Sequence, residues 1–190
     1  AGDCIYAHQQ WDTEAGVLTG YAQAPEQLVN LTDAWPTDLG PTPQTMTREV
    51  SEAQCPALDF VRAFQGAASS DLEITLGDSV VSRADGVVGT IHNPRARQNW
   101  LVLIDPNGRI FSLMNQLEAE RNGVRRFSFR LPSAAPGKYI VMATAAEAGL
   151  VRAGAMQSGT EAAVFMPLIT RELMEDPAAA VAIAALEILP

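Results

Sequence analysis

The chain has 190 residues, of which 47% are hydrophobic and 18% are charged, and its formal net charge is −9. This composition is ordinary for a globular protein and excludes a chain that is disordered throughout. The negative charge argues against nucleic acid as the main partner, since the phosphate backbone attracts basic surfaces, and no apolar run reaches the ~18 residues of a membrane-spanning helix.

The first third of the chain predicts a small unit of strands and helices. Two short β-prone runs lie at residues 4–8 and 17–21, and an apolar-periodic segment over 25–35 begins with one proline and stops before another. Proline is tolerated in the first turn of a helix and ends a helix that it follows, so this segment is typical of a helix. Residues 45–50 then predict a strand, and 56–64 predict a second short helix.

The two cysteines of the chain, Cys4 and Cys55, lie near the two ends of this first unit. Their separation excludes a CxxC redox motif, and two thiolates are too few for a structural zinc site. A disulfide between them would close the unit into a loop and contribute roughly 4 kcal/mol in the chain-entropy model. Because disulfides persist in oxidising compartments, we expect a periplasmic or other extracytoplasmic location. The sequence starts without a basic, apolar leader, so any targeting segment is expected outside this chain.

The pattern changes after residues 66–70, a Gly-Ala-Ala-Ser-Ser run that is the best candidate for a linker. Short runs of alternating apolar residues follow, separated by turn signals such as the Asp-Pro-Asn-Gly sequence at 105–108. These runs lie at residues 72–76, 86–92, 100–104, 109–113, 126–131 and 139–143. Short, half-buried strands at regular spacing predict an antiparallel β-sandwich. We therefore predict two units, residues 1–66 and 71–190.

The tail of the chain is harder to interpret. Apolar residues between 162 and 173 fall at helical spacing, although Pro167 would kink or delay that helix. Residues 178–189 are rich in alanine, which favours a helix, but end on an apolar run, which favours a closing strand. We favour mostly helix with an extended end. The predicted fold class is therefore α+β: a small disulfide-linked α/β unit followed by an antiparallel β-sandwich with a C-terminal helical segment.

Basic residues gather in the second unit. Residues 1–66 carry nine acids and two bases, whereas residues 83–138 carry nine bases and four acids. Four of these bases flank two loops and could converge to grip a carboxylate or a phosphate with their planar guanidiniums. They are Arg95, Arg97, Arg125 and Arg126. The alternative is that they pair with Glu118, Glu120 or the acidic first unit.

The sequence offers little for catalysis. His8 and His92 are its only histidines, and on an extended strand Cys4 would lie about 13 Å from His8, too far for a nucleophile and its base. Two histidines without further ligands make a poor metal site. Two pairs of acids would share a strand face without forming a recognised catalytic signature; they are Asp71 with Glu73 and Glu118 with Glu120. We expect no enzymatic activity, no metal and no cofactor.

Two parts of the sequence resemble known families. Residues 16–22, Gly-Val-Leu-Thr-Gly-Tyr-Ala, followed by a Pro-Glu-Gln-Leu helix start and then a strand, resemble a BON-type unit. Residues 100–110, together with 127–129 and 137–140, are similar to a β-sandwich module appended to bacterial membrane-anchored serine/threonine kinases and caspase-like proteins. The Cys-Pro-Ala-Leu-Asp-Phe run at 55–60 is similar to the joint between these two pieces in proteobacterial kinases.

This resemblance implies a non-catalytic extracytoplasmic sensor or recognition module. Its expected partner is an envelope protein or an anionic ligand, namely peptidoglycan or a lipid head group, and a membrane-anchored kinase would precede this chain. No Gly-rich loop, His-Arg-Asp or Asp-Phe-Gly motif of a kinase is present in the sequence itself. Two alternatives stay open: a carboxylate-based hydrolase with a cleft between the two modules, and a structural assembly subunit whose apolar tail covers a partner.

Overall fold

The computed structural model of the chain describes residues 4–11, 16–33, 35, 42, 44–65, 71–95, 97–147 and 150–190. The predicted linker at 66–70 lies outside these residues. The strands are β1 (Ile5–Trp11), β2 (Gly16–Ala22), β3 (Gln44–Glu49), β4 (Glu73–Leu76), β5 (Val80–Ser82), β6 (Gly86–His92), β7 (Gln98–Ile104), β8 (Arg109–Ser112), β9 (Val124–Arg130), β10 (Gly137–Ala146), β11 (Thr160–Glu161) and β12 (Ala180–Leu189). The helices are α1 (Glu26–Asp33), α2 (Cys55–Ala63), α3 (Val151–Ala155) and α4 (Ala162–Leu173), with 3-10 turns η2 (Glu52–Gln54) and η4 (Met114–Gln116).

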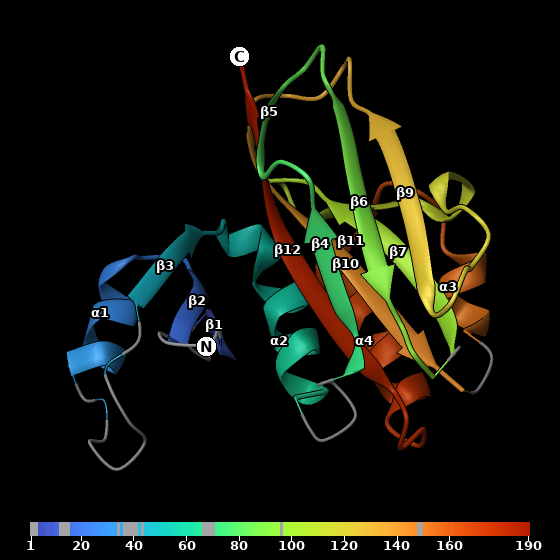
Figure 1. Cartoon of the computed structure of the whole chain (residues 1–190), viewed down its shortest axis with the longest axis horizontal. Helices are drawn as coiled ribbons and strands as arrows, with labels where there is room; N and C mark the ends of the chain where they lie inside the picture. The colour runs from blue at the N-terminus through green and yellow to red at the C-terminus, as the bar shows by residue number, and fades with distance from the viewer. Residues whose placement is uncertain are drawn as a thin grey trace.

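The described strands form three sheets, and the fold is α+β as predicted. The N-terminal sheet has the order β1-β2-β3, with β2 antiparallel to β1 and parallel to β3. The large sheet has the order β11-β8-β7-β10-β12-β5 and is antiparallel except for the β12–β5 pair. The small sheet, β4-β6-β9, is antiparallel. Figure 1 shows the small sheet in front of the large sheet, with the N-terminal sheet and α1 to one side.

The middle of the large sheet is buried on both faces. Every residue from Tyr139 to Ala146 on β10 and from Asn99 to Ile104 on β7 is buried. Alternate residues of β10 belong to different cores: Met142 lies in the cluster that includes the helices, and Val141 lies in the cluster that includes the small sheet. The molecule is therefore built in layers, with helices on one face of the large sheet and the small sheet on the other.

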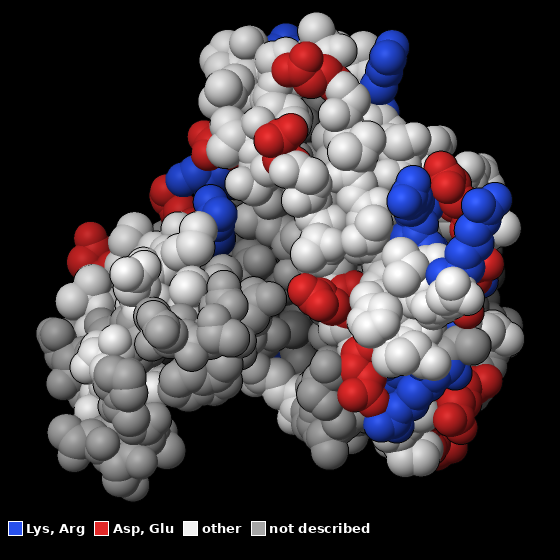
Figure 2. Space-filling view, viewed as in Figure 1, with Lys and Arg blue, Asp and Glu red and all other residues white. Residues whose placement is uncertain are grey.

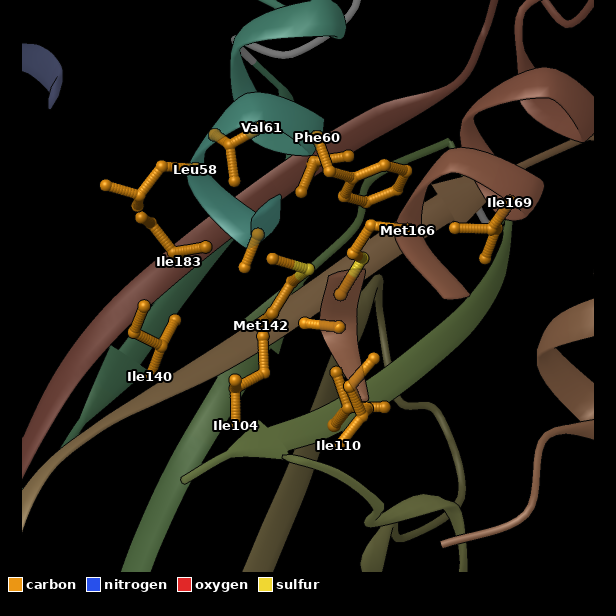
Figure 3. Packing of buried hydrophobic residues seen from close by; sticks show 14 of the residues in the cluster. Leu58, Phe60, Val61, Ile104, Ile110, Ile140, Met142, Met166, Ile169 and Ile183 are labelled. Atoms are coloured by element: carbon orange, nitrogen blue, oxygen red, sulfur yellow. The ribbon is translucent and has the colours of Figure 1, made fainter. Parts of the chain in front are cut away.

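Helices α2 and α4 cover the first of these faces. Phe60 of α2 and Met166 and Ile169 of α4 gather over Met142 of β10, as Figure 3 shows. Full burial of one such side chain contributes about 1.5–3 kcal/mol. Pro167 lies inside α4 with its ring exposed, and the predicted helix over 162–173 is confirmed as one continuous element.

The small sheet covers the second face with its aromatic residues. Phe127 and Phe129 of β9 are buried, whereas Arg126, Ser128 and Arg130 between and beside them are exposed. This alternation is the one predicted from the sequence. It leaves the outward face of the small sheet open to solvent.

The predicted disulfide is present and joins Cys4 to Cys55. Cys4 directly precedes β1, and Cys55 is the first residue of α2, so the bond ties the N-terminal sheet to a helix of the main core. A second contact joins the N-terminal sheet to the large sheet, because the Tyr21 hydroxyl donates a hydrogen bond to the Ile183 carbonyl at 3.4 Å. The N-terminal sheet is therefore held against the edge of β12.

The expectation of a mostly helical segment at 178–189 is wrong. Residues 180–189 form strand β12, which lies between β10 and β5 and pairs with β10 over most of its length. Helix propensity is a weak preference that tertiary contacts override. Here the neighbouring strands supply the backbone partners, and small side chains such as Ala180 fit between the two cores. The alanines from Ala180 onward thus lie within the sheet.

Close contact between β6 and β9 leaves no room for a side chain at Gly89. A Cβ there would lie 2.6 Å from the Thr75 carbonyl and would also meet the Phe127 ring. Overpacking of this kind costs typically 1–3 kcal/mol, so we expect Gly89→Ala to lower the free energy of unfolding by about that amount in urea denaturation. The matched control is Gly86→Ala on the same strand, whose Cβ would meet nothing closer than 3.8 Å. Equal stabilities of the two variants would contradict this packing.

Burial of His8 predicts acid sensitivity. Its ring stacks near Tyr21, with centroids 6.3 Å apart, and burial lowers the pKa of His8 below its ordinary value of 6.5. As the pH drops through about 6.5, His8 becomes protonated more readily in the unfolded chain than in the folded chain. The free energy of unfolding therefore falls as the pH drops. We expect His8→Phe to flatten the dependence of Tm on pH between about 5 and 7. His92→Gln, at an exposed histidine, should keep the wild-type slope, and loss of the slope in that control instead would contradict the assignment.

Candidate functional site

Two connecting segments that carry three of the predicted arginines lie side by side. The Asn93 N–H, which follows β6, donates to the Gly123 carbonyl, which precedes β9, at 2.7 Å. Arg95 and Arg97 lie on the first segment, and Arg125 lies near the start of β9. The structure therefore brings these two segments together, as the sequence hypothesis required.

Arg97 points into the protein, and only 3% of it is exposed. Its Nε donates to Asn93 Oδ1 at 3.1 Å, and an Nη donates to the Ala178 carbonyl at 2.6 Å. The Asn93 amide in turn donates to Asn99 Oδ1 at 3.0 Å. Burial, the largest cause, lowers the pKa of Arg97, and the carboxylate of Asp176 is among those that oppose the shift. Arg97 thus anchors the segment that leads into β12.

The other three arginines are nearer the surface. Arg95 forms a salt bridge of 2.5 Å with Asp71, and Arg125 Nε lies 3.6 Å from Glu120. Arg126 is exposed on the outward face of β9, and no salt bridge within the described ranges includes it. Of the four, Arg126 is therefore the guanidinium placed best to meet a ligand, and the anion-binding role of the group stays a prediction.

Polar side chains cross the small sheet in a row that contains Arg126. In the strand register Thr75 lies opposite Thr90, and Thr90 lies opposite Arg126. The two threonine hydroxyls are 2.7 Å apart and share a hydrogen bond. Directly opposite residues on one face of a sheet have Cβ atoms about 4.5–5.5 Å apart, so Thr90 lies beside Arg126 and Thr75 lies one strand further away.

This row lies in a shallow groove of about 580 Å³ on the outward face of the small sheet. Its polar lining is completed by Ser128 on β9 and by Glu118, whose N–H donates to the Arg126 carbonyl at 2.8 Å. We call this surface the outer groove; its polar members are Thr75, Thr90, Glu118, Arg126 and Ser128. Figure 2 shows basic side chains, with acidic ones between them, on the face of the molecule that carries β9.

The described lining of the outer groove carries groups that suit an oxyanion. A guanidinium donates two parallel hydrogen bonds to a carboxylate or a phosphate. Of the two threonine hydroxyls, one donates to the other, and the second can donate to a remaining ligand oxygen. Among the described residues that line the groove, Glu118 is the only acid. General acid–base catalysis needs a group of tuned pKa beside a reacting atom.

The other candidates from the sequence do not form a reactive site in the structure. Cys4 is oxidised in its disulfide, His8 packs on Tyr6 and Tyr21, and His92 is exposed opposite Glu73. Within the described part of the chain, no three His, Cys, Asp or Glu side chains come close enough to hold a metal ion. No described helix has the length and apolar character that crossing a bilayer would require.

Sequence reasoning found Arg126 but missed Thr75 and Thr90. Their strands were predicted, and alternation places both residues on the outward face. The register that aligns them with Arg126 depends on pairing between distant strands, which alternation alone does not specify. The predicted strands thus indicated that these residues face outward, but not that Thr75, Thr90 and Arg126 align in one row across the sheet.

Comparison with known proteins adds no relative. No protein-family model matches the sequence, and no curated protein matches it either. The resemblance to BON-type units and to kinase-associated sandwich modules therefore stays a prediction.

The buried position of Arg97 makes a prediction that separates it from Arg95. Arg97→Met leaves the Asn93 and Ala178 oxygens without their donor inside the protein, and each orphaned polar group costs about 1–3 kcal/mol. We expect thermal and urea denaturation to show a loss of about 2–5 kcal/mol. The matched change Arg95→Met breaks only a half-exposed pair, which is worth about 0–1 kcal/mol. If both variants lose the same stability, Arg97 is not the anchor described.

Proposed function

We propose that this chain is a non-catalytic recognition module that binds an anionic ligand of the bacterial envelope through the outer groove. The single observation that carries the proposal is the row of Thr75, Thr90 and Arg126, which presents a guanidinium and two hydroxyls on an open sheet face. A phosphate of a lipid head group and a carboxylate of peptidoglycan share the oxyanion chemistry that such a row recognises.

Local positive charge on β9 counters the negative net charge of the chain. Although the chain carries a formal net charge of −9, the outward positions of β9 carry Arg126 and Arg130 with Ser128 between them. Arg126 and Arg130 are four residues apart on one face of the strand, so their backbones lie about 13 Å from each other. A repeating anion could therefore contact both guanidiniums, and because these charges are exposed, salt should weaken the binding.

The proposed location is the periplasm or another extracytoplasmic space. The Cys4–Cys55 disulfide supports this, since such bonds persist where thiols are not kept reduced. In this proposal the chain reports the bound ligand to a membrane-anchored kinase that lies outside the sequence described.

The hydrolase alternative has less support in the geometry. Between the N-terminal sheet and the sandwich the two lining acids are Glu49 and Glu187, and Glu49 is engaged by Lys138 at 2.5 Å. A pair of carboxylates that shares a proton, or that splits into an acid and a base, needs both groups to face a substrate.

An envelope protein with an acidic segment is the second candidate ligand of the outer groove. Val88 is 54% exposed beside the row and would add apolar contact with such a protein.

The proposal predicts that binding depends on Arg126. Wild-type protein should co-sediment with phosphatidylglycerol vesicles or with sacculi at low salt, and Arg126→Gln should bind about tenfold or more weakly, since a hydrogen bond to a charged group is worth about 1.5–3 kcal/mol. Arg83→Gln removes the same charge from an exposed turn outside the outer groove and should bind like the wild type.

Three results would contradict the proposal. These are equal losses in the two variants, binding to phosphatidylcholine vesicles as strong as to phosphatidylglycerol, and binding to neither vesicles nor sacculi at any salt concentration. Binding to envelope proteins alone, with the same dependence on Arg126, would assign the groove to an acidic protein segment.

A further inference from the structure

A second cavity, separate from the outer groove, lies where the N-terminal sheet meets the end of the large sheet. It holds about 120 Å³, and its lining comes from β3 on one side and from the start of β10 and the end of β12 on the other. By the same measure a single water needs about 10–15 Å³, so a small organic molecule fits. We call it the junction cavity. Figure 2 shows acidic and basic side chains gathered together at this meeting point.

One wall of the junction cavity is held rigidly by Gln54. This side chain is fully buried, and its amide nitrogen donates to the carbonyls of Lys138 at 3.0 Å and Asp105 at 3.1 Å. Its oxygen accepts the Ser51 N–H at 3.0 Å. Both hydrogens of the Gln54 amide nitrogen are therefore used, and the side chain acts as a fixed support between η2 and the large sheet.

Tyr21 is a buried part of the lining of the junction cavity. It is 2% exposed, and its hydroxyl donates to the Ile183 carbonyl on the open edge of β12. Burial raises the pKa of Tyr21 well above its usual range. The phenol therefore stays protonated at any physiological pH, and the charge of the cavity is set by the other residues.

Four charged side chains line the junction cavity, two of each sign. Lys138 forms a salt bridge with Glu49 at 2.5 Å, which neutralises one charge of each sign. The remaining two are Arg48, which lies beside Tyr21 in the register of β3 and β2, and Glu187, which lies opposite Lys138 in the register of β12 and β10. Among the residues that the structure describes, no salt bridge includes Arg48 or Glu187.

From this arrangement we propose that the junction cavity binds a small zwitterion, a molecule that carries both a carboxylate and an ammonium group, such as a free α-amino acid. Arg48 would take the carboxylate with its planar guanidinium, and Glu187 would accept hydrogen bonds from the ammonium group. The partly enclosed site strengthens both interactions relative to bulk water. A dipolar ligand matches a lining whose charges sum to zero, whereas an ion of one sign would leave either Arg48 or Glu187 unmatched.

A ligand in the junction cavity would join two parts of the protein. Arg48 belongs to the N-terminal sheet, and Glu187 belongs to the large sheet. Binding would therefore fasten the N-terminal sheet to the sandwich, and a ligand that binds only the folded state raises its stability by mass action.

Thermal unfolding with alanine as the probe tests this inference. At an alanine concentration well above its Kd, we expect Tm to rise by about 3–6 °C. Sodium acetate and methylammonium chloride at the same concentration each supply one charge only and should give no more than a small rise. N-acetylalanine and alanine amide, which each lack one charge of alanine, should behave like these salts.

Matched variants assign the two charges. Arg48→Gln and Glu187→Gln should each abolish the rise with alanine, whereas Arg126→Gln, which belongs to the outer groove, should keep it. The inference is overturned if alanine gives no rise in the wild type, if acetate is as effective as alanine, or if both junction variants respond like the wild type. Because Arg126→Gln affects only vesicle or sacculus binding, failure of this inference and failure of the proposed function are distinguishable.

Discussion

Strands β7 and β10 have no face that water reaches, so both sides of the large sheet must be covered by other layers. The small sheet covers one side, and α2 and α4 cover the other. This requirement also fixes the place of the N-terminal sheet, because α2 starts at the cysteine that is bonded to Cys4. Helix α2 is therefore held both by the disulfide and by core packing. Through this helix the short N-terminal sheet, which would be marginally stable by itself, is fixed to the main core.

The same layering decides which surfaces remain for recognition. The small sheet uses its inward residues for the core and keeps only its outward face, where Arg126 and the two threonines lie in one row. The junction cavity arises because the helices do not cover the end of the large sheet, and the N-terminal sheet covers it with charged and polar residues instead. One surface is open and suits an extended anion, and the other is more enclosed and suits a small dipolar molecule. If both are used, the module can respond to two ligands of different size.

Much of this fold could be predicted from local patterns. Helix α4 and the alternation of Phe127 and Phe129 with arginine each depend on a few neighbouring residues, and the disulfide follows from the two cysteines alone. Strand β12 could not, because its alanines favour a helix locally and only pairing with β10 makes it a strand. The burial of Arg97 could not be predicted either, because it depends on the Ala178 carbonyl, 81 residues further along the chain. A lone charge in a predicted loop, such as Arg97, carries no local sign that it faces the interior.

The most direct test of this account is amide hydrogen exchange of the free protein and of the protein bound to phosphatidylglycerol vesicles. Exchange should be slowest in β7 and β10 in both samples, because these strands are buried on both faces and open only with the whole domain. Binding should slow exchange further in the outer groove, over β4, β6, β9 and the segment around Glu118. Fast exchange in β10, or protection by vesicles that appears on α4 and leaves the outer groove unchanged, would contradict the account.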